Sequence, residues 1–298
     1  MNKIFTTAMA AVLLSCTSIP ESGFNPDDGS REELIVGSVE TTSTKSPYSA
    51  SRLTGAFGAM LTGKGSTDRY DGLDYKNVRF VSDGNSICIP DREILLSSTE
   101  GTLYSYYPYS AAVNDLRKIP VSVTESIQTD YMYGTPVTRL DNRNASTVIT
   151  MNHALAAMRL SIVKGTYSGK GEISKIAVSG DALASEAYLD ATTGRLSGFK
   201  GMGSEIRADI NGSSSEALSE SGTEKHFLLI PTGEARPLTI TVTIDGVDFT
   251  AISPEVDLEE GTITSYTVTV NSRDFSLSIG YITPWVTVLQ KNYEFEVY

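Results

Sequence analysis

Residues 238–249 read Leu-Thr-Ile-Thr-Val-Thr-Ile-Asp-Gly-Val-Asp-Phe and carry the clearest structural signal in the chain. Apolar and polar residues alternate strictly from Leu238 to Ile244, a pattern typical of a strand with one face in a core. Asp245-Gly246 then favours a two-residue turn that leads into an antiparallel partner, Val247-Asp248-Phe249. The stretch therefore predicts an antiparallel β-hairpin.

The same kind of pattern extends over most of the chain. Short apolar or alternating runs, separated by Gly, Asp, Asn and Ser, predict strands at 34–36, 53–61, 78–81, 86–89, 93–96, 102–107, 119–123, 148–151, 154–163, 173–178, 186–189, 227–230 and 266–270. No stretch keeps apolar residues at helical spacing over three turns. Residues 201–225 are rich in Gly, Ser and Glu and predict a long surface loop. Many short strands at this spacing predict an all-β protein built from β-sandwiches.

Composition narrows the class of protein further. The chain has 298 residues, of which 40% are hydrophobic and 20% charged, so it can bury a core. Its formal net charge of −12 argues against nucleic acid as a partner, because such binding needs clustered Lys and Arg. No apolar stretch approaches the roughly 20 residues of a membrane-spanning helix.

The N-terminal residues predict export and lipid attachment. Lys3 precedes the apolar run Ile4–Leu14, which has the length of a signal-peptide core. Leu13-Leu14-Ser15-Cys16 then fits the lipobox of bacterial lipoproteins, so we expect cleavage between Ser15 and Cys16 and lipidation of the Cys16 thiol. The alternatives are an ordinary signal peptide or a buried segment with a chance cysteine.

The expected organisation has four parts. Residues 1–15 form the lipoprotein signal peptide, and residues 16–30, dominated by Pro, Ser, Asn, Asp and Gly, form a linker. A turn-rich stretch near 134–147 is the best boundary between two domains. We therefore place an N-terminal domain at 31–147 and a C-terminal domain at 148–298.

Catalytic chemistry is poorly supported. The two histidines, His153 and His226, each begin an apolar strand, and Cys88 fits a small buried hydrophobe in Ser86-Ile87-Cys88-Ile89. Neither a G-x-S-x-G motif nor histidines at ligand spacing occur. The sequence therefore predicts no catalytic residue, no metal site and no cofactor.

One aromatic cluster requires a choice between two interpretations. Tyr104, Tyr106, Tyr107 and Tyr109 lie within six residues. In a sandwich strand Tyr104 and Tyr106 would face the core, while Tyr107 would face outward. The alternative is an exposed row on which sugars stack.

Several segments together resemble the fimbrillin family of Bacteroidales, the type V pilins and their minor, Mfa-like subunits. Each segment is weak alone, but their order and spacing cover nearly the whole chain. They are the lipobox, Tyr106-Tyr107-Pro108, Thr129–Gly134, Met151–Leu160, Phe227–Pro231, Leu258–Gly261 before Tyr266–Val270, and Ile282–Trp285.

The resemblance implies two transthyretin-like β-sandwich domains in tandem and assembly by strand exchange. In such pilins a trypsin-like protease removes the N-terminal segment with its first strand, and a neighbouring subunit's strand fills the groove. Lys45 and Arg52 fit the expected cleavage region, although Lys45 stands where many relatives carry arginine. Both residues could equally be solvated loop residues.

The C-terminal residues offer a candidate donor strand. In Tyr293-Glu-Phe-Glu-Val-Tyr298 the apolar residues Tyr293, Phe295 and Val297 alternate with polar positions. Such an edge strand could pair with a groove, while the glutamates discourage unplanned aggregation. The alternative is that it completes the sheet of its own domain.

These observations predict a non-enzymatic, structural and adhesive subunit of a bacterial surface fimbria (pilus). We expect it at the outer membrane and cell surface, with other fimbrial subunits as partners in a homo- or hetero-polymer. A host or bacterial surface ligand is a further expected partner. The alternative is a lipid-anchored, glycan-binding protein of an outer-membrane uptake system.

Overall fold

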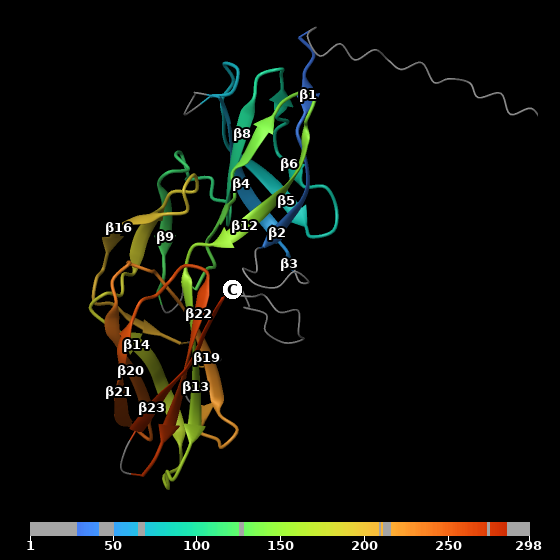
Figure 1. Cartoon of the computed structure of the whole chain (residues 1–298). Coiled ribbons are helices and arrows are strands. Elements are labelled where there is room, and N and C mark those ends of the chain that lie inside the picture. The colour runs from blue at the N-terminus through green and yellow to red at the C-terminus, as the bar shows by residue number, and fades with distance from the viewer. Residues whose placement is uncertain are drawn as a thin grey trace, which may run out of the picture.

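The protein is built from β-strands that form two groups of sheets, one above the other (Figure 1). The computed structural model describes residues 29–41, 51–64, 69–124, 128–208, 210, 216–272 and 275–284. No helix occurs in these ranges. The expected all-β, sandwich-type class is therefore confirmed, while the division into two transthyretin-like domains stays a prediction.

The N-terminal half, residues 29–153, is organised around one large sheet. Its strand order is β3 (Ser51–Arg52), β2 (Ile35–Thr41), β12 (Ser146–His153), β10 (Met132–Gly134), β8 (Gly101–Tyr107), β4 (Thr54–Gly63), β5 (Tyr75–Asp83) and β6 (Ile89–Pro90), with β11 (Val137–Leu140) paired to β8. A short pair, β1 (Glu32–Glu33) with β7 (Leu95–Leu96), lies beside it. The core of this half includes Phe57 and Phe80, whose rings stack 5.2 Å apart.

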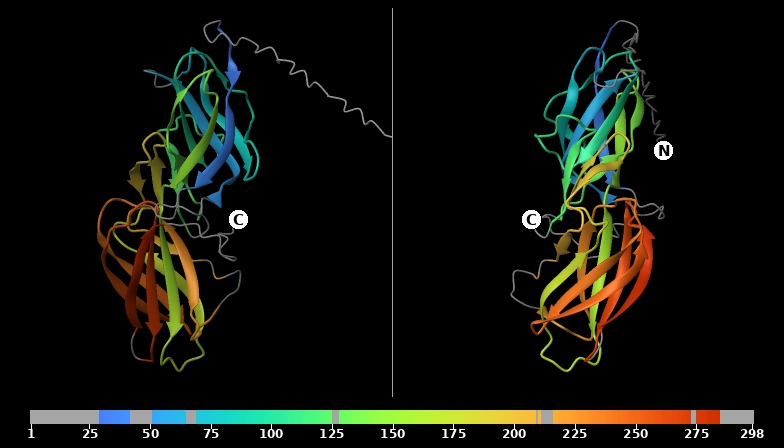
Figure 2. Two further views of the ribbon diagram at one scale, coloured as in Figure 1. Left: turned by 45° about the vertical axis from the view of Figure 1, so that its right-hand side comes forward. Right: turned by 90° about the vertical axis from the view of Figure 1, so that its left-hand side faces the viewer.

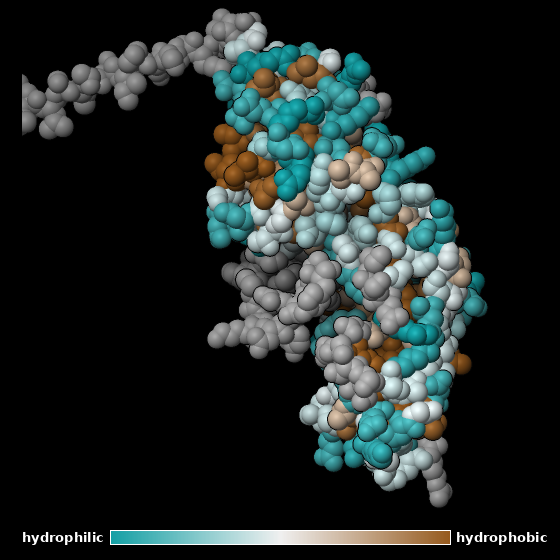
Figure 3. Space-filling model, turned by 180° about the vertical axis from the view of Figure 1, so that it is seen from behind, coloured by the Kyte–Doolittle hydropathy of each residue, from teal (hydrophilic) through white to brown (hydrophobic). Residues whose placement is uncertain are grey.

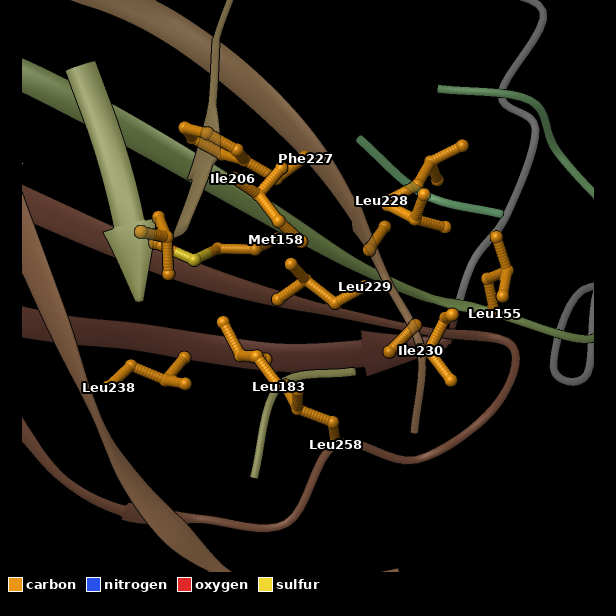
Figure 4. Packing of buried hydrophobic residues seen from close by; sticks show 14 of the residues in the cluster. Leu155, Met158, Leu183, Ile206, Phe227, Leu228, Leu229, Ile230, Leu238 and Leu258 are labelled. Carbon is orange, nitrogen blue, oxygen red and sulfur yellow. The ribbon is translucent and has the colours of Figure 1, made fainter. Parts of the chain in front are cut away.

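The C-terminal half, residues 154–284, contains two facing sheets. One has the order β19 (Thr223–Leu229), β13 (Ala156–Lys164), β22 (Thr262–Val270) and β23 (Phe275–Pro284). The other has the order β17 (Glu205–Arg207), β14 (Glu172–Ser179), β20 (Arg236–Ile244) and β21 (Val247–Val256), with β18 (Glu216–Ala217) paired to β14. Met158, Phe227 and Ile206 point toward one another between these sheets (Figure 4).

A third, small sheet joins the two halves. Its order is β16 (Leu196–Lys200), β15 (Glu186–Leu189) and β9 (Ile119–Ser122), so a strand from the N-terminal half pairs with one from the C-terminal half. Apolar residues 113–123 also pack in the C-terminal core. The halves are therefore interlocked, and β12 runs through the expected boundary at 147/148 to His153.

Tyr106 anchors the segment that leads to this small sheet. It is fully buried, its ring lies against Gly58, and its hydroxyl donates to Asn77 Oδ1 at 2.7 Å. The Asn77 amide in turn donates to the carbonyl oxygen of Val113 at 2.8 Å. Burial raises the pKa of Tyr106 to about 12. A β-carbon at position 58 would lie only 2.1 Å from the ring, which explains the glycine.

Two expectations were wrong. The stretch 201–225 is not one surface loop, because β17, β18 and the start of β19 lie within it. One buried residue lies in β17 (Ile206) and one directly follows β18 (Leu218), and alternation cannot reveal strands as short as these. Tyr107 does not face outward either: it is half-buried against the N-terminal core, on the same side of β8 as Leu103, whereas Tyr104 and Tyr106 pack against the C-terminal core.

The predicted hairpin is confirmed, with Ile244 opposite Val247. Asp245 and Gly246 have φ values of 51° and 78°, as a two-residue turn of this kind requires. The Asp245 carboxylate accepts hydrogen bonds from the backbone N–H groups of Gly171 (3.0 Å) and Glu172 (2.9 Å) and from the Tyr167 hydroxyl (2.7 Å). These bonds lower the pKa of Asp245 from 3.8 to about 2.

Replacing Asp245 by asparagine is expected to lower stability at pH 7 but not at pH 2. The folded pKa lies below the ordinary value, so the charge stabilises the fold above about pH 4 and this contribution is lost as the pH falls toward 2. Asparagine keeps the turn because it tolerates positive φ. Chemical unfolding at pH 7, 4 and 2 should show wild type and variant converging; a constant difference would contradict this.

Candidate assembly site at the first strand

The first strand in the described part of the chain, by which we mean β1, Leu34 and β2 together (residues 32–41), lies between two other parts of its half. On one side β2 runs parallel to β12, with Ile149 opposite Val39 and Met151 opposite Thr41 (Figure 2, blue beside light green). On the other side the strand faces the segment that carries Cys88 and Ile94. Taking this strand out would therefore leave a groove with an open backbone on both sides.

Hydrogen bonds hold the strand on that second side. The Leu34 amide donates to the carbonyl oxygen of Ile94 at 2.8 Å, and the carbonyl oxygen of Val36 accepts from the amide of Cys88 at 2.8 Å. The carbonyl oxygen of Val39 accepts from the amide of Leu53 at 2.9 Å. The strand is therefore bound as an interior strand, although it belongs to the first segment that the structure describes.

Three apolar side chains of the strand are buried in the core, and a fourth is exposed. Leu34, Val36 and Val39 are 2%, 0% and 1% exposed, whereas Ile35 is 41% exposed. At roughly 1.5–3 kcal/mol for each buried apolar side chain, these three contribute about 5–9 kcal/mol, as an upper estimate. An empty groove would expose apolar surface whose burial is worth the same free energy, and it would therefore bind a matching strand strongly.

Only one of the two expected cleavage residues can be located. Lys45 lies outside the described residues, in the segment between β2 and β3. Arg52 lies in β3, opposite Glu40, is exposed and donates from Nη1 to the carbonyl oxygen of Gly84 at 3.3 Å. Cleavage after Arg52 would therefore require β3 to leave its pairing.

The other predicted site residues lie outside the described part of the chain. They are Ser15 and Cys16 near the N-terminus, and Tyr293, Phe295 and Val297 near the C-terminus. The last described strand, β23, ends at Pro284. Within the described ranges, no helix is long and apolar enough to cross a membrane.

Sequence reasoning missed the residues that line the groove. Ile149 and Met151 on β12 and the Cys88–Ile94 segment form its two sides, and both lie far along the chain from the first strand. Alternation in 146–153 signals a strand with one buried face. No local signal says that this strand pairs in parallel with residues 35–41.

The side chains considered for catalysis, His153, His226 and Cys88, lie in surroundings typical of structural residues. His153 is buried and its Nδ1 lies 2.9 Å from the Asp130 carboxylate, while His226 Nε2 lies 3.2 Å from Glu224. Burial lowers the pKa of His226 and raises the pKa of the Cys88 thiol. Cys88 is buried beside the first strand, as expected of a small hydrophobe. The described residues contain no cluster of metal ligands.

The tyrosine cluster does not form an exposed row. Tyr106 is buried, and Tyr104 and Tyr107 are half-buried against different cores. Tyr109 is half-buried, and the Arg79 guanidinium lies 5.8 Å from its ring centre. This arrangement matches packing better than a platform on which sugars stack.

Exposed apolar residues gather near the groove instead. Val81 and Ile89 are opposite each other on β5 and β6, and Ile87 and Ile89 flank Cys88. Ile35 on the first strand is also exposed. An apolar patch is visible on the surface of the N-terminal half (Figure 3).

Comparisons with known proteins agree with this architecture. The fimbrillin-like family model matches residues 44–285. No curated protein matches the sequence. A solved structure of a candidate cell adhesion protein from Bacteroides ovatus is 16% identical with a TM-score of 0.68, over 87% of this chain and 99% of that chain.

Two further solved structures share the fold. A candidate cell adhesion protein from Bacteroides uniformis is 18% identical with a TM-score of 0.64, over 85% of this chain and 99% of that chain. The tip fimbrial protein Mfa3 from Porphyromonas gingivalis, with a C-terminal truncation, is 8% identical with a TM-score of 0.50, over 86% of this chain and 100% of that chain. Because the family model covers most of the sequence, the chain belongs to the fimbrillin-like family.

Proposed function

We propose that this protein is a structural subunit of a bacterial surface fimbria, delivered as a lipoprotein and assembled by β-strand exchange. Membership of the fimbrillin-like family supports the fimbrial part of the proposal. The observation that carries the assembly part is the first strand. Three of its apolar side chains are buried in the N-terminal core, and residues 42–50 connect it covalently to β3 and the strands that follow.

Delivery and maturation form the first two steps. Lipid on Cys16 holds the precursor at the outer membrane, on the cell surface. A protease then cuts after Lys45 or Arg52, so that residues 32–41 are no longer linked to β4. Because an exchangeable strand is held by non-covalent contacts alone, this cut turns a folded precursor into an acceptor.

Strand exchange forms the last step. The emptied groove offers backbone partners on both sides and pockets for alternate side chains, which is the usual mode of β-augmentation. A second subunit supplies the strand, and the alternating segment with Tyr293, Phe295 and Val297 is the candidate. The protein therefore acts through binding to other subunits rather than through chemistry.

Electron microscopy and N-terminal sequencing test this proposal together. Cells with the protein should carry filaments that bind antibodies against it, and cells without it should lose or shorten those filaments. The filament form should start after Lys45 or Arg52, whereas the membrane form should start at Cys16. Filaments whose subunits start only at Cys16 would contradict maturation.

Variants at the two basic residues should identify the cut. In the double variant Lys45→Ala/Arg52→Ala the protein should stay lipid-attached, and the amount in filaments should fall at least about tenfold. Each single variant then shows which residue is used. Arg31→Ala is the matched control, because Arg31 precedes the strand and pairs with Asp71 at 2.9 Å; its maturation should be normal.

A further inference from the structure

The first strand contains one residue too many for its partner. Thr147 and Val148 are consecutive on β12, but they pair with Val36 and Ser38, so Gly37 is an extra residue in β2. The pairing is continuous on either side of this β-bulge, from Ser146 with Ile35 to Met151 with Thr41. The irregularity therefore belongs to the first strand and not to the groove.

The buried side chains show the same interruption. Leu34 and Val36 are two positions apart, and Val39 and Thr41 are two positions apart, but Val36 and Val39 are three apart. On β12 the buried residues Ile149, Met151 and His153 follow strict alternation. The β12 side of the groove is thus regular, whereas the first strand, which fills the groove, is not.

The opposite side of the groove is equally compatible with a regular strand. Val36 and Val39 both direct their carbonyl oxygens to that side, where they accept from Cys88 and Leu53. In a regular strand, residues two apart direct their carbonyls to the same side. Removing Gly37 would place Val36 and Val39 two apart and would keep every paired partner in register.

Two costs follow for the resident strand. A bulge leaves its extra residue outside the ladder and interrupts the hydrogen bonding. Glycine inside a strand also loses the most conformational freedom on folding. A Cβ at position 37 would lie 3.6 Å from the carbonyl oxygen of Thr147, an ordinary contact, so steric hindrance does not require glycine here.

We infer that the bulge at Gly37 weakens the binding of the first strand in its groove, and that the groove binds a strictly alternating strand more tightly than it binds the first strand. This inference rests on the proposed strand exchange and names the partner: a strand from a second subunit with inward apolar residues at every second position and no inserted residue. The segment 293–298 alternates in this way, with Tyr293, Phe295 and Val297 spaced by two.

Deleting Gly37 from the full-length protein tests the inference. The shortened strand becomes regular, so the thermal midpoint should rise by a few degrees, although a residue has been removed from an interior strand. After cleavage within residues 42–52, release of the strand and formation of polymers should be at least about fivefold slower than in wild type. A fivefold change corresponds to the net free energy of roughly one hydrogen bond. Gly37→Ala keeps the bulge and should stay within about twofold of wild type.

A peptide competition separates the possible failures. Labelled peptides of residues 30–41, with and without Gly37, are added to the cleaved protein. The inference expects the shorter peptide to bind at least about fivefold more tightly. Equal or weaker binding of the shorter peptide, or a lowered thermal midpoint in the deletion variant, would overturn it. If neither peptide binds and wild type never polymerises, the proposed strand exchange itself fails.

Discussion

Replacing Val36 by aspartate is expected to lower the free energy of unfolding by about 4 kcal/mol or more. Val36 is 0% exposed, lies opposite Thr147 on one side of the first strand and pairs with Cys88 on the other. The variant loses an apolar contribution of roughly 1.5–3 kcal/mol and places a carboxylate where desolvation costs several kcal/mol more. The first strand should therefore leave the sheet, since its departure returns the charge to water.

Two measurements check this result. Chemical denaturation gives the loss of stability, and limited proteolysis shows whether the region of residues 42–52 becomes susceptible before the rest of the chain. Ile35→Asp is the matched control: the residue is adjacent on the same strand but 41% exposed, so its cost should stay below about 1 kcal/mol. Equal costs for the two variants would contradict the assignment of inward and outward faces.

Replacing Glu216 by glutamine is expected to cost about 3 kcal/mol or more. Glu216 and Lys225 lie 2.5 Å apart, with side chains only 15% and 10% exposed. Glu216 belongs to β18, which pairs with β14, and Lys225 belongs to β19, which pairs with β13, so the ion pair joins the two sheets of the C-terminal half. Without the carboxylate, the Lys225 ammonium stays buried beside a neutral amide.

Denaturation of three variants tests this expectation. Glu100→Gln removes an ion pair of similar length, 2.9 Å from Lys64, whose side chains are 45% and 78% exposed; it should cost less than about 1 kcal/mol. The double variant Glu216→Leu/Lys225→Met should recover most of the loss, because apolar replacement of a buried pair is often neutral or stabilising. A Glu216→Gln variant as stable as Glu100→Gln would show that the buried pair contributes no more than the exposed one.

Local signals in the sequence predicted local structure well. The hairpin at Asp245-Gly246 follows from turn chemistry within four residues, and a short run of residues typical of strands predicted β15 at its observed bounds, 186–189. Such patterns fix which face of a strand is buried. They also predicted a strand at 34–36, which lies within the observed first strand, residues 32–41.

Long-range pairing could not be predicted in this way. Alternation at 119–123 indicates a strand but cannot say that it pairs with β15 of the other half. The parallel pairing of β2 with β12 joins segments separated by several strands, and no residue in either segment specifies the other. For the same reason the sequence predicted only part of the candidate site, because the residues that line its groove come together only in the folded chain. The terminal site residues and Lys45 remain predictions.

The interlocking of the two halves has a mechanical consequence. The two halves are joined by the pairing of β9 with β15. In addition, the Ala191 amide donates to the carbonyl oxygen of Leu116 at 2.8 Å, and the Val123 amide donates to the carbonyl oxygen of Ser185 at 2.9 Å. A rotation of one half against the other would have to break these bonds together and expose the apolar residues beneath them. Each subunit is therefore stiff, so a filament made of such subunits would bend at its subunit junctions, and its flexibility would be set by the strands that join them.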